Sequence, residues 1–337
     1  MHRGLRPFTA LPLILVACVG SHGNSSIPKV SPSVLARGFP TRPVRLIEPF
    51  GVGGGPDLLA RALAPHLSEL WSQPVSVENI TGAGATAGPA LVAQSPADGH
   101  TLLLSTSAQA YSVVIASSLP YNPSNDFIPV AALTSQPYVL VASTRAGFST
   151  VSELIAAAKA RPRELKFGSA GIGTGTHLAV EKLNLEAGIA AVHVPASGAN
   201  ATVDVLASTV AGRLDYMMAP ISLALPDIRA RRLIALGVSG TQRSALLRDV
   251  PTIAEAGVPG FNFPIWYGLW APAGTPPQVV DQLAKDIVTV LATPALKQWT
   301  TEHGAERVSM TRADFTRYVR AESENAARIM KAARVAP

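Results

Sequence analysis

The sequence predicts an α/β protein of two lobes, each built on a mostly parallel sheet that is flanked by helices. Short runs rich in β-branched residues or leucine alternate with stretches whose apolar residues recur every three and four positions, which is the rhythm of βα units. The chain has 337 residues, which exceeds the usual size of a single core even without its first 42 residues. Glycine-rich turns also join an expected strand to an expected helix at two distant places.

The beginning of the chain predicts an export signal followed by a tether. Residues 1–6 carry two arginines, and the apolar stretch 7–19 is typical of a signal peptide and too short to span a membrane. The only cysteine, Cys18, ends a Leu-Val-Ala-Cys segment that resembles a bacterial lipobox. We expect residues 1–17 to be a signal peptide, Cys18 to be lipidated, and residues 18–42 to be a tether. An ordinary signal peptide with a chance cysteine is the alternative.

The charge of the chain is mildly positive. The formal net charge is +6, and loss of Arg3 and Arg6 with the signal peptide leaves 26 − 22 = +4. A positive surface favours encounter with an anionic ligand, although a solvated surface with a slight excess of lysine and arginine is an equally good interpretation. No run of basic residues with interleaved aromatic residues indicates nucleic acid. A single cysteine excludes intramolecular disulfides, so stability must come from the cores.

Eight strands are expected from short apolar runs bounded by turn residues. They cover residues 44–48, 75–78, 101–105, 138–142, 165–168, 192–194, 214–218 and 233–238.

Five helices are expected between and after these strands from the helical spacing of apolar residues. They cover residues 58–70, 151–160, 177–187, 201–211 and 277–291. Thr150 and Glu153 have the spacing of a capping box, and Gly188 and Gly212 stand where a left-handed residue ends a helix. Pro65 lies inside the first helical pattern and removes a backbone hydrogen bond, so we expect that helix to kink or restart there.

Residues 257–264, with two glycines and two prolines, separate the last βα units from the apolar run 265–270. We interpret this run as a return of the chain to its first lobe. Lobe 1 then comprises residues 43–139 and 266–337, and lobe 2 comprises residues 140–265. Two strands cross between the lobes, which is a geometry suited to closure about a hinge.

The first glycine-rich turn, EPFGVGGGPD, covers residues 48–57 between a strand and a helix. Glycine lets backbone amides approach a ligand closely, and amides at a helix N-terminus favour an anion. We therefore expect Phe50, Gly53, Gly54 and Asp57 to contact a ligand. A helix-terminus residue stabilised by the helix dipole is the alternative role for Asp57.

The second glycine-rich turn, FGSAGIGTGTH, covers residues 167–177 and would supply amides and hydroxyls from the other lobe. Its candidate ligand-binding residues are Ser169, Ala170, Gly171, Thr174 and His177. A histidine at a helix start is more often bonded to the backbone than to a ligand, so that alternative stays open for His177.

Polar residues after the third strand offer a further part of a binding surface. Ser105 and Ser107 are the candidates there, with Thr106 and Gln109 beside them. Loop hydroxyls with a purely structural role are the alternative. Trp266 could line a cleft or simply pack.

The common sequence signals of catalysis are absent. The sequence contains no GxxxxGK[ST], GxSxG or HExxH pattern, which argues against phosphate-loop NTPases, elbow-type serine hydrolases and zincins. We expect no catalytic residue, no metal site and no cofactor.

Several separate segments, in order, resemble the tripartite tricarboxylate transporter receptor family, the Bug-type periplasmic solute-binding proteins. The resemblance spans residues 43–334 and rests on TRPVRLIEPFGVGGGPDLLAR, VENITGAGATAG, ADGHTLLL, LPYNPSNDFIPVA, KFGSAGIGTGTHL, HVPASG, DVPTIAEAGVPGF and YGLWAPAGTP.

The resemblance implies a two-lobed periplasmic-binding-protein fold of the type II-like kind. It implies that the loops at residues 50–57 and 168–177 grip the carboxylate of a small ligand, partly through water. It also implies a periplasmic receptor, anchored to the membrane if Cys18 is lipidated, that serves either the membrane subunits of a transporter or a sensing system. We expect the receptor to be a monomer.

Three departures from the family pattern bear on the pocket. Val52 replaces a common proline, Ala196 and Ser197 replace a Tyr-Lys pair, and Ala219 and Pro220 replace an Asp-Asn pair. Ala219 is thus expected in a less polar pocket wall, which weakens the case for an amino-acid ligand because its ammonium group would lack a counter-charge.

Two functions follow from these observations. The leading one is a binding protein that is not an enzyme. The alternative is a periplasmic or membrane-anchored hydrolase of a small carboxylate or ester, with His177 as general base and Asp57 as the group that orients it.

Overall fold

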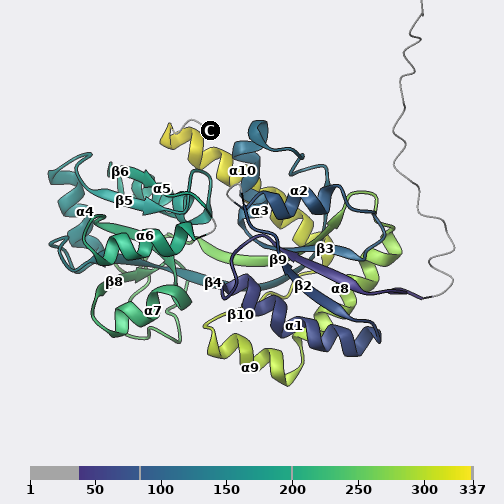
Figure 1. The fold of residues 1–337 in the computed structure, drawn as a ribbon. Helices are drawn as coiled ribbons and strands as arrows, with labels where there is room; N and C mark the ends of the chain where they lie inside the picture. Colours follow the sequence, from purple (N-terminus) through teal and green to yellow (C-terminus); the bar gives the residue numbers. More distant parts are fainter. Residues whose placement is uncertain (1–37, 83–84, 199, 335–337) are drawn as a thin grey trace, which may run out of the picture.

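The computed structural model describes residues 38–82, 85–198 and 200–334. The expected signal peptide, Cys18 and the tether before residue 38 lie outside the described residues. Within the described part of the chain the α/β fold class is confirmed, because strands alternate with helices in both halves of the molecule. Figure 1 shows the teal and green elements on one side and the purple, blue and yellow elements on the other.

The strands have the following bounds in chain order: β1 (Val44–Glu48), β2 (Val75–Asn79), β3 (Thr101–Thr106), β4 (Phe127–Ser143), β5 (Lys166–Ser169), β6 (Val192–Pro195), β7 (Tyr216–Pro220), β8 (Leu233–Val238), β9 (Pro264–Pro272) and β10 (Glu306–Arg307). The helices are α1 (Gly55–Trp71), α2 (Ala87–Ala93), α3 (Ala108–Tyr111), the 3₁₀ helix η2 (Ser112–Ser118), α4 (Val151–Ala160), α5 (Gly175–Ala187), α6 (Ala201–Val210), α7 (Ile221–Arg229), α8 (Pro277–Leu291), α9 (Pro294–Glu302) and α10 (Arg312–Ala333).

The strands form one continuous sheet in the order β2-β1-β3-β9-β4-β7-β5-β6. In the first half, β1 pairs in parallel with β2 and β3, and β9 pairs antiparallel with both β3 and β4. In the second half, β5 pairs in parallel with β6 and β7, and β4 pairs antiparallel with β7 and β8. β4 is therefore the strand that belongs to both halves.

Two chain segments cross between the halves side by side. β4 and β9 stay paired as far as Pro137 and Pro264. Beyond that pair, Ser239 links the two segments, because its Oγ accepts from Tyr138 N at 2.8 Å and donates to Phe263 O at 2.8 Å. The expectation of two crossing strands is borne out by these pairings, whereas the division into lobes at residues 139/140 and 265/266 stays a prediction.

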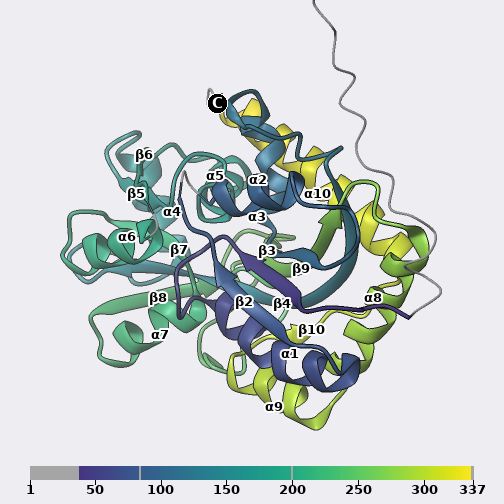
Figure 2. The same ribbon diagram turned by 45° about the vertical axis from the view of Figure 1, so that its right-hand side comes forward.

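Helix α10 connects the two halves a second time. It packs against α3, η2 and β4 of the first half and against α5 of the second, and both views show its C-terminal end near α5 (Figures 1 and 2). Its Glu322 accepts hydrogen bonds from Tyr111 Oη at 2.9 Å and from Trp266 Nε1 at 3.2 Å. The largest hydrophobic cluster contains buried residues of both halves, so one core continues through the crossing.

The local sequence signals are confirmed at the start of α4 and at the end of α5. Thr150 Oγ1 accepts from Glu153 N at 3.1 Å at the start of α4, and Gly188 ends α5 with a φ of 62°. The expected restart at Pro65 is wrong, since α1 runs through it without interruption. Pro65 and Arg61 are both exposed, so water can reach the Arg61 carbonyl that loses its intrahelical donor. In the described residues, no helix is both long and apolar enough to cross a membrane.

Candidate functional site

The first glycine loop leaves β1 and enters α1 by folding back on itself. Gly53 has a φ of 83°, a conformation that glycine adopts without a steric cost. Its N–H donates to Asp57 Oδ2 at 2.8 Å, and the N–H of Gly54 donates to Gly51 O at 3.2 Å. Asp57 thus stabilises its own loop by a hydrogen bond, which agrees with the alternative role of this residue at the helix terminus.

A polar cluster with two buried carboxyl groups, those of Glu48 and Asp57, lies behind this loop. Asn79 Nδ2 donates to Glu48 Oε2 at 2.8 Å and to Asp57 Oδ1 at 2.9 Å, while Arg61 Nε donates to Asp57 at 3.0 Å. Burial alone would raise the pKa of Asp57, but the hydrogen bonds from Arg61, Gly53 and Asn79 outweigh it and lower the pKa. Burial raises the pKa of Glu48 to about 8, against the hydrogen bonds from Asn79 and from the backbone. One carboxyl of the cluster is therefore ionised and the other neutral near pH 7.

The second glycine loop leaves β5 and enters α5 in a similar way. Gly171 and Gly173 have φ values of 128° and 77°. The N–H of Gly171 donates to Ser169 Oγ at 3.1 Å, and the N–H of Gly173 donates to His177 Nδ1 at 3.2 Å. His177 is buried and bonded to the backbone, as its alternative interpretation expects.

Two histidine rings stack behind the second loop. The ring centroids of His177 and His193 are 4.0 Å apart at an interplanar angle of 19°, and Phe167 stacks on both rings. His193 Nε2 lies 2.6 Å from Ser169 Oγ. Burial, together with the charge of His177, lowers the pKa of His193 to about 3, so this ring is neutral at physiological pH.

Each glycine loop also meets a tyrosine of a crossing strand at the first residue of its helix. A Cβ built on Gly55 would overlap the hydroxyl of Tyr267, and a Cβ built on Gly175 would overlap the hydroxyl of Tyr138. Both tyrosines are buried. Both loops therefore pack against the crossing strands in the same way. In each, the glycine at the helix start leaves space for a tyrosine hydroxyl.

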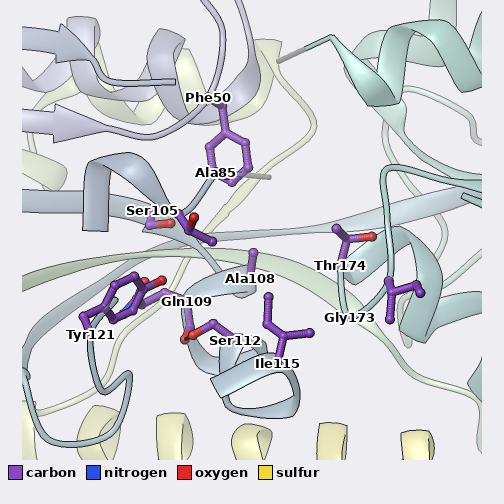
Figure 3. Close-up of a pocket in the computed structure, with 12 residues that line it drawn as sticks. Phe50, Ala85, Ser105, Ala108, Gln109, Ser112, Ile115, Tyr121, Gly173 and Thr174 are labelled. Atoms are coloured by element: carbon purple, nitrogen blue, oxygen red, sulfur yellow. Dashed lines mark hydrogen bonds between the residues drawn. The ribbon is translucent and has the colours of Figure 1, made fainter. Parts of the chain in front are cut away.

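The two loops border one pocket between the halves (Figure 3). It is open to solvent, and none of the described residues that line it is charged. The lining residues are Phe50, Ala85, Thr86, Ser105, Ala108, Gln109, Ser112, Ile115, Tyr121, Ile172, Gly173 and Thr174. Among the residues that the structure describes, no group of histidine, cysteine, aspartate or glutamate side chains could hold a metal ion.

The expected site residues fall into two groups. Phe50, Ser105 and Thr174 line the pocket. The others belong to the loops or to the walls behind them, and their contacts with a ligand stay predictions: Gly53, Gly54, Asp57, Ser107, Ser169, Ala170, Gly171, His177 and Ala219.

The backbone amides of the loops are largely engaged inside the loops. The amides of Gly53, Gly54 and Gly171 donate as described above, and Ala170 N donates to Thr176 Oγ1 at 3.0 Å. Ala219 lies buried on β7, paired with Val139 of β4.

Sequence reasoning missed most of the pocket wall opposite the loops. Ser112, Ile115 and Tyr121 come from η2 and the segment after it, where no pattern typical of ligand binding occurs. Tyr121 lies within the LPYNPSNDFIPVA segment, so the family resemblance was the only signal that could have drawn attention to it.

A family model described as the tripartite tricarboxylate transporter family receptor matches residues 59–335. Protein BugT of Bordetella pertussis is 36% identical over 285 residues, which cover 84% of this chain and 86% of BugT. A UPF0065 protein from the tcbD–tcbE intergenic region of Pseudomonas sp. (strain P51) is 40% identical over 265 residues, which cover 77% of this chain and 78% of that protein.

Solved structures show the same fold. A structure of an R. palustris protein with adipate matches with a TM-score of 0.80 at 32% identity, covering 89% of this chain and 100% of that one. MatC from Rhodopseudomonas palustris with bound malate matches with a TM-score of 0.76 at 31% identity, covering 86% of this chain and 99% of that one. The periplasmic binding protein BugD matches with a TM-score of 0.77 at 29% identity, covering 88% of this chain and 99% of that one.

Proposed function

Because the chain belongs to the tripartite tricarboxylate transporter receptor family, we propose that it captures one small carboxylate ligand between its two glycine loops and releases it unchanged. Receptors of this family are periplasmic solute-binding proteins. The captured ligand would pass to the membrane subunits of a transporter or serve as a signal.

The observation that carries the proposal is the position of the two loops on opposite sides of one pocket. Phe50 lines it from the first half, and Gly173 and Thr174 line it from the second. Each loop leads into a long helix, α1 of 17 residues and α5 of 13 residues, so each of the two sides carries partial positive charge from a helix N-terminus. One carboxylate is the group that such a place favours.

The ligands of two similar proteins support the same class of molecule. The structures that match this chain with TM-scores of 0.80 and 0.76 contain adipate and malate. Both are small carboxylates, and the same class suits the pocket described above.

The geometry favours a binding protein over the hydrolase alternative. Asp57 bonds to Gly53, Arg61 and Asn79, and among the hydrogen bonds of the described residues none joins Asp57 to His177. The two groups thus lack the contact that a general base and its orienting acid need. Ser169 touches His193, but it is fully buried and is not among the residues that line the pocket.

The test combines binding and turnover on one panel of carboxylates. The panel contains adipate, malate and succinate with their monoamides, and it is scored by thermal shift, by calorimetry and by mass spectrometry of the ligand after incubation. A ligand that binds the folded state raises the melting temperature. Formation of any product would overturn the claim that the protein is not an enzyme, and a panel without any shift would overturn the ligand class.

A variant in the first loop ties binding to the pocket. A Cβ at Gly54 would lie 3.3 Å from Gly51 O and 3.9 Å from Pro56 Cδ, so a side chain there requires only a small shift of the loop. Thermal unfolding of Gly54→Val checks that the variant is folded. Gly54→Val should weaken binding by roughly 10-fold or more, since it blocks the approach of a ligand to the backbone. Ala207→Val, at an exposed site on α6, is the matched control and should bind like the wild type.

We further propose a periplasmic monomer that is anchored to the membrane through a lipid on Cys18. This part of the proposal rests on the lipobox-like segment of the sequence and on the location of family receptors.

A further inference from the structure

The pocket between the halves has two unlike ends. Gly173 and Thr174 form one end, beside the start of α5, and Phe50 stands over the pocket from the first loop (Figure 3). Gln109 and Tyr121 gather at the other end (Figure 3). A ligand held by its carboxylate at the loops therefore turns its far end toward Gln109 and Tyr121.

Partial positive charge gathers at the end of the pocket beside Gly173 and Thr174, because the long helix α5 begins there. The helix at the far end, α3, has only four residues. The first amide of α3, Ala108 N, already donates to Thr106 Oγ1 at 3.1 Å. Among the described residues that line the pocket, none is a lysine, an arginine or a histidine. A second carboxylate at the far end would lose its water without gaining a cation or a helix terminus, which costs free energy.

The far end nevertheless contains a hydrogen-bond donor that lacks a partner. Gln109 is only 4% exposed, and its Nε2 is buried with no hydrogen-bond partner among the described residues. Gln109 lines both this pocket and a second cavity beside α10, so it stands in the wall between them. A buried amide N–H without an acceptor is unfavourable, and an uncharged oxygen of a ligand would satisfy it.

The neighbours of Gln109 are neutral as well. The Ser112 hydroxyl donates to Gln109 O at 2.7 Å, so its hydrogen is used within the wall. Burial raises the pKa of Tyr121 to about 12, against a hydrogen bond with Ser112, and the phenol therefore stays neutral. The far end can recognise a polar group by hydrogen bonds but supplies no charge to balance an anion.

We propose that this receptor selects monocarboxylates whose far end carries an uncharged oxygen acceptor, and that Gln109 is the residue that recognises that acceptor. The inference rests on the proposed function, since it assumes that the carboxylate binds at the glycine loops. The proposed ligands differ from adipate and malate, the ligands in the two similar structures, because adipate and malate carry a second carboxylate.

The experiment compares each dicarboxylate of the panel with its own monoamide, which has the same length and shape but one charge fewer. At pH 7.5 the wild type should bind a monoamide roughly 10-fold more tightly than the matching dicarboxylate. Where a dicarboxylate has two monoamides, the one that binds more tightly is compared. Gln109→Met keeps the length of the side chain and removes the donor, so it should lower the affinity for the monoamide by about 10-fold and bring the ratio of the two affinities toward one. Gln94→Met changes the same residue type at an exposed site after α2 and should keep the wild-type ratio.

The outcomes separate this inference from the proposed function. A dicarboxylate that binds as tightly as its monoamide, or more tightly, overturns the inference while it supports a carboxylate receptor. An unchanged ratio in Gln109→Met overturns the role of Gln109 even if monoamides are preferred. A panel in which nothing binds overturns the proposed function, and this inference falls with it.

Discussion

Replacing Glu48 by glutamine should remove a pH dependence of the free energy of unfolding that arises beside the first glycine loop. Glu48 ends β1 and is fully buried. Its Oε2 accepts from Phe50 N at 3.0 Å and from Asn79 Nδ2 at 2.8 Å, whereas its Oε1 is buried without a partner among the described residues. Burial raises the pKa to about 8, and the negative charge of Asp57 adds to the increase. The carboxyl is therefore neutral in the folded protein at pH 7.

The sign and size of the effect follow from the pKa in the two states. In the unfolded chain Glu48 has its ordinary pKa near 4.5, and in the folded protein its pKa is about 8. Between these values the folded state holds a proton that the unfolded state has lost, so the free energy of unfolding falls by up to about 1.4 kcal/mol per pH unit as the pH rises. The stabilisation is fully present below pH 4.5 and is lost through pH 8, with a total of about 5 kcal/mol as an upper bound.

The measurement is urea unfolding of the wild type and of Glu48→Gln at steps between pH 5 and pH 9. Glutamine is neutral at every pH and keeps the two acceptor contacts, so its stability should change less over this range. The titration of other groups, such as the histidines, is shared by both proteins and cancels in the difference between the two curves. The free energy of unfolding of the variant, relative to that of the wild type, should rise by about 4 kcal/mol between pH 5 and pH 9. Parallel curves would refute the assignment of a neutral buried carboxyl to Glu48.

Three other features can each be tested: the proposed lipid on Cys18, the crossing strands and the start of α5. Mass spectrometry of the protein from its native host should show a diacylglyceryl group on Cys18, and a product that begins near residue 21 or later would contradict it. Small-angle scattering should give a smaller radius of gyration with saturating ligand, because β4 and β9 allow closure, and an unchanged radius would count against it. Gly175→Ala should destabilise the fold by about 1–3 kcal/mol in thermal or urea unfolding, since the new Cβ overlaps the Tyr138 hydroxyl. Adding Tyr138→Phe should restore part of this loss, and no recovery would show that the strain arises elsewhere.

The sequence predicted the elements whose signals are local. The bounds of α4 and α8 agree with expectation because Thr150 caps one helix and Pro277 begins the other. The first part of β4 was missed, since Pro129 and Pro137 interrupt its pattern and its partner β9 lies more than a hundred positions away in the chain. Helix α10 was missed because only four of its 22 residues are buried, which leaves a weak apolar period.

The candidate site was predictable in one part only. Glycine turns between a strand and a helix are visible in the sequence, so both loops were found. Their internal bonding was not visible, because the partner of Gly173 N is the buried ring of His177 and the partner of Gly53 N is Asp57. The far wall depends on how η2 packs against α10 and α3, and that is a matter of tertiary packing. Gln109 therefore stood out only as a polar residue beside a strand.

The central position of β9 in the sheet affects the order in which the two halves can fold. β3 finds its antiparallel neighbour only when Leu103 pairs with Trp270, a separation of 270 − 103 = 167 positions. The pairings that β4, β5, β6, β7 and β8 make with one another all fall within residues 138–238. Contacts that are distant in sequence form late, because the intervening chain must first be brought together. A growing chain can thus finish its second half while the first still lacks a central strand, and a chain that ends before Pro264 has no finished sheet behind its first glycine loop.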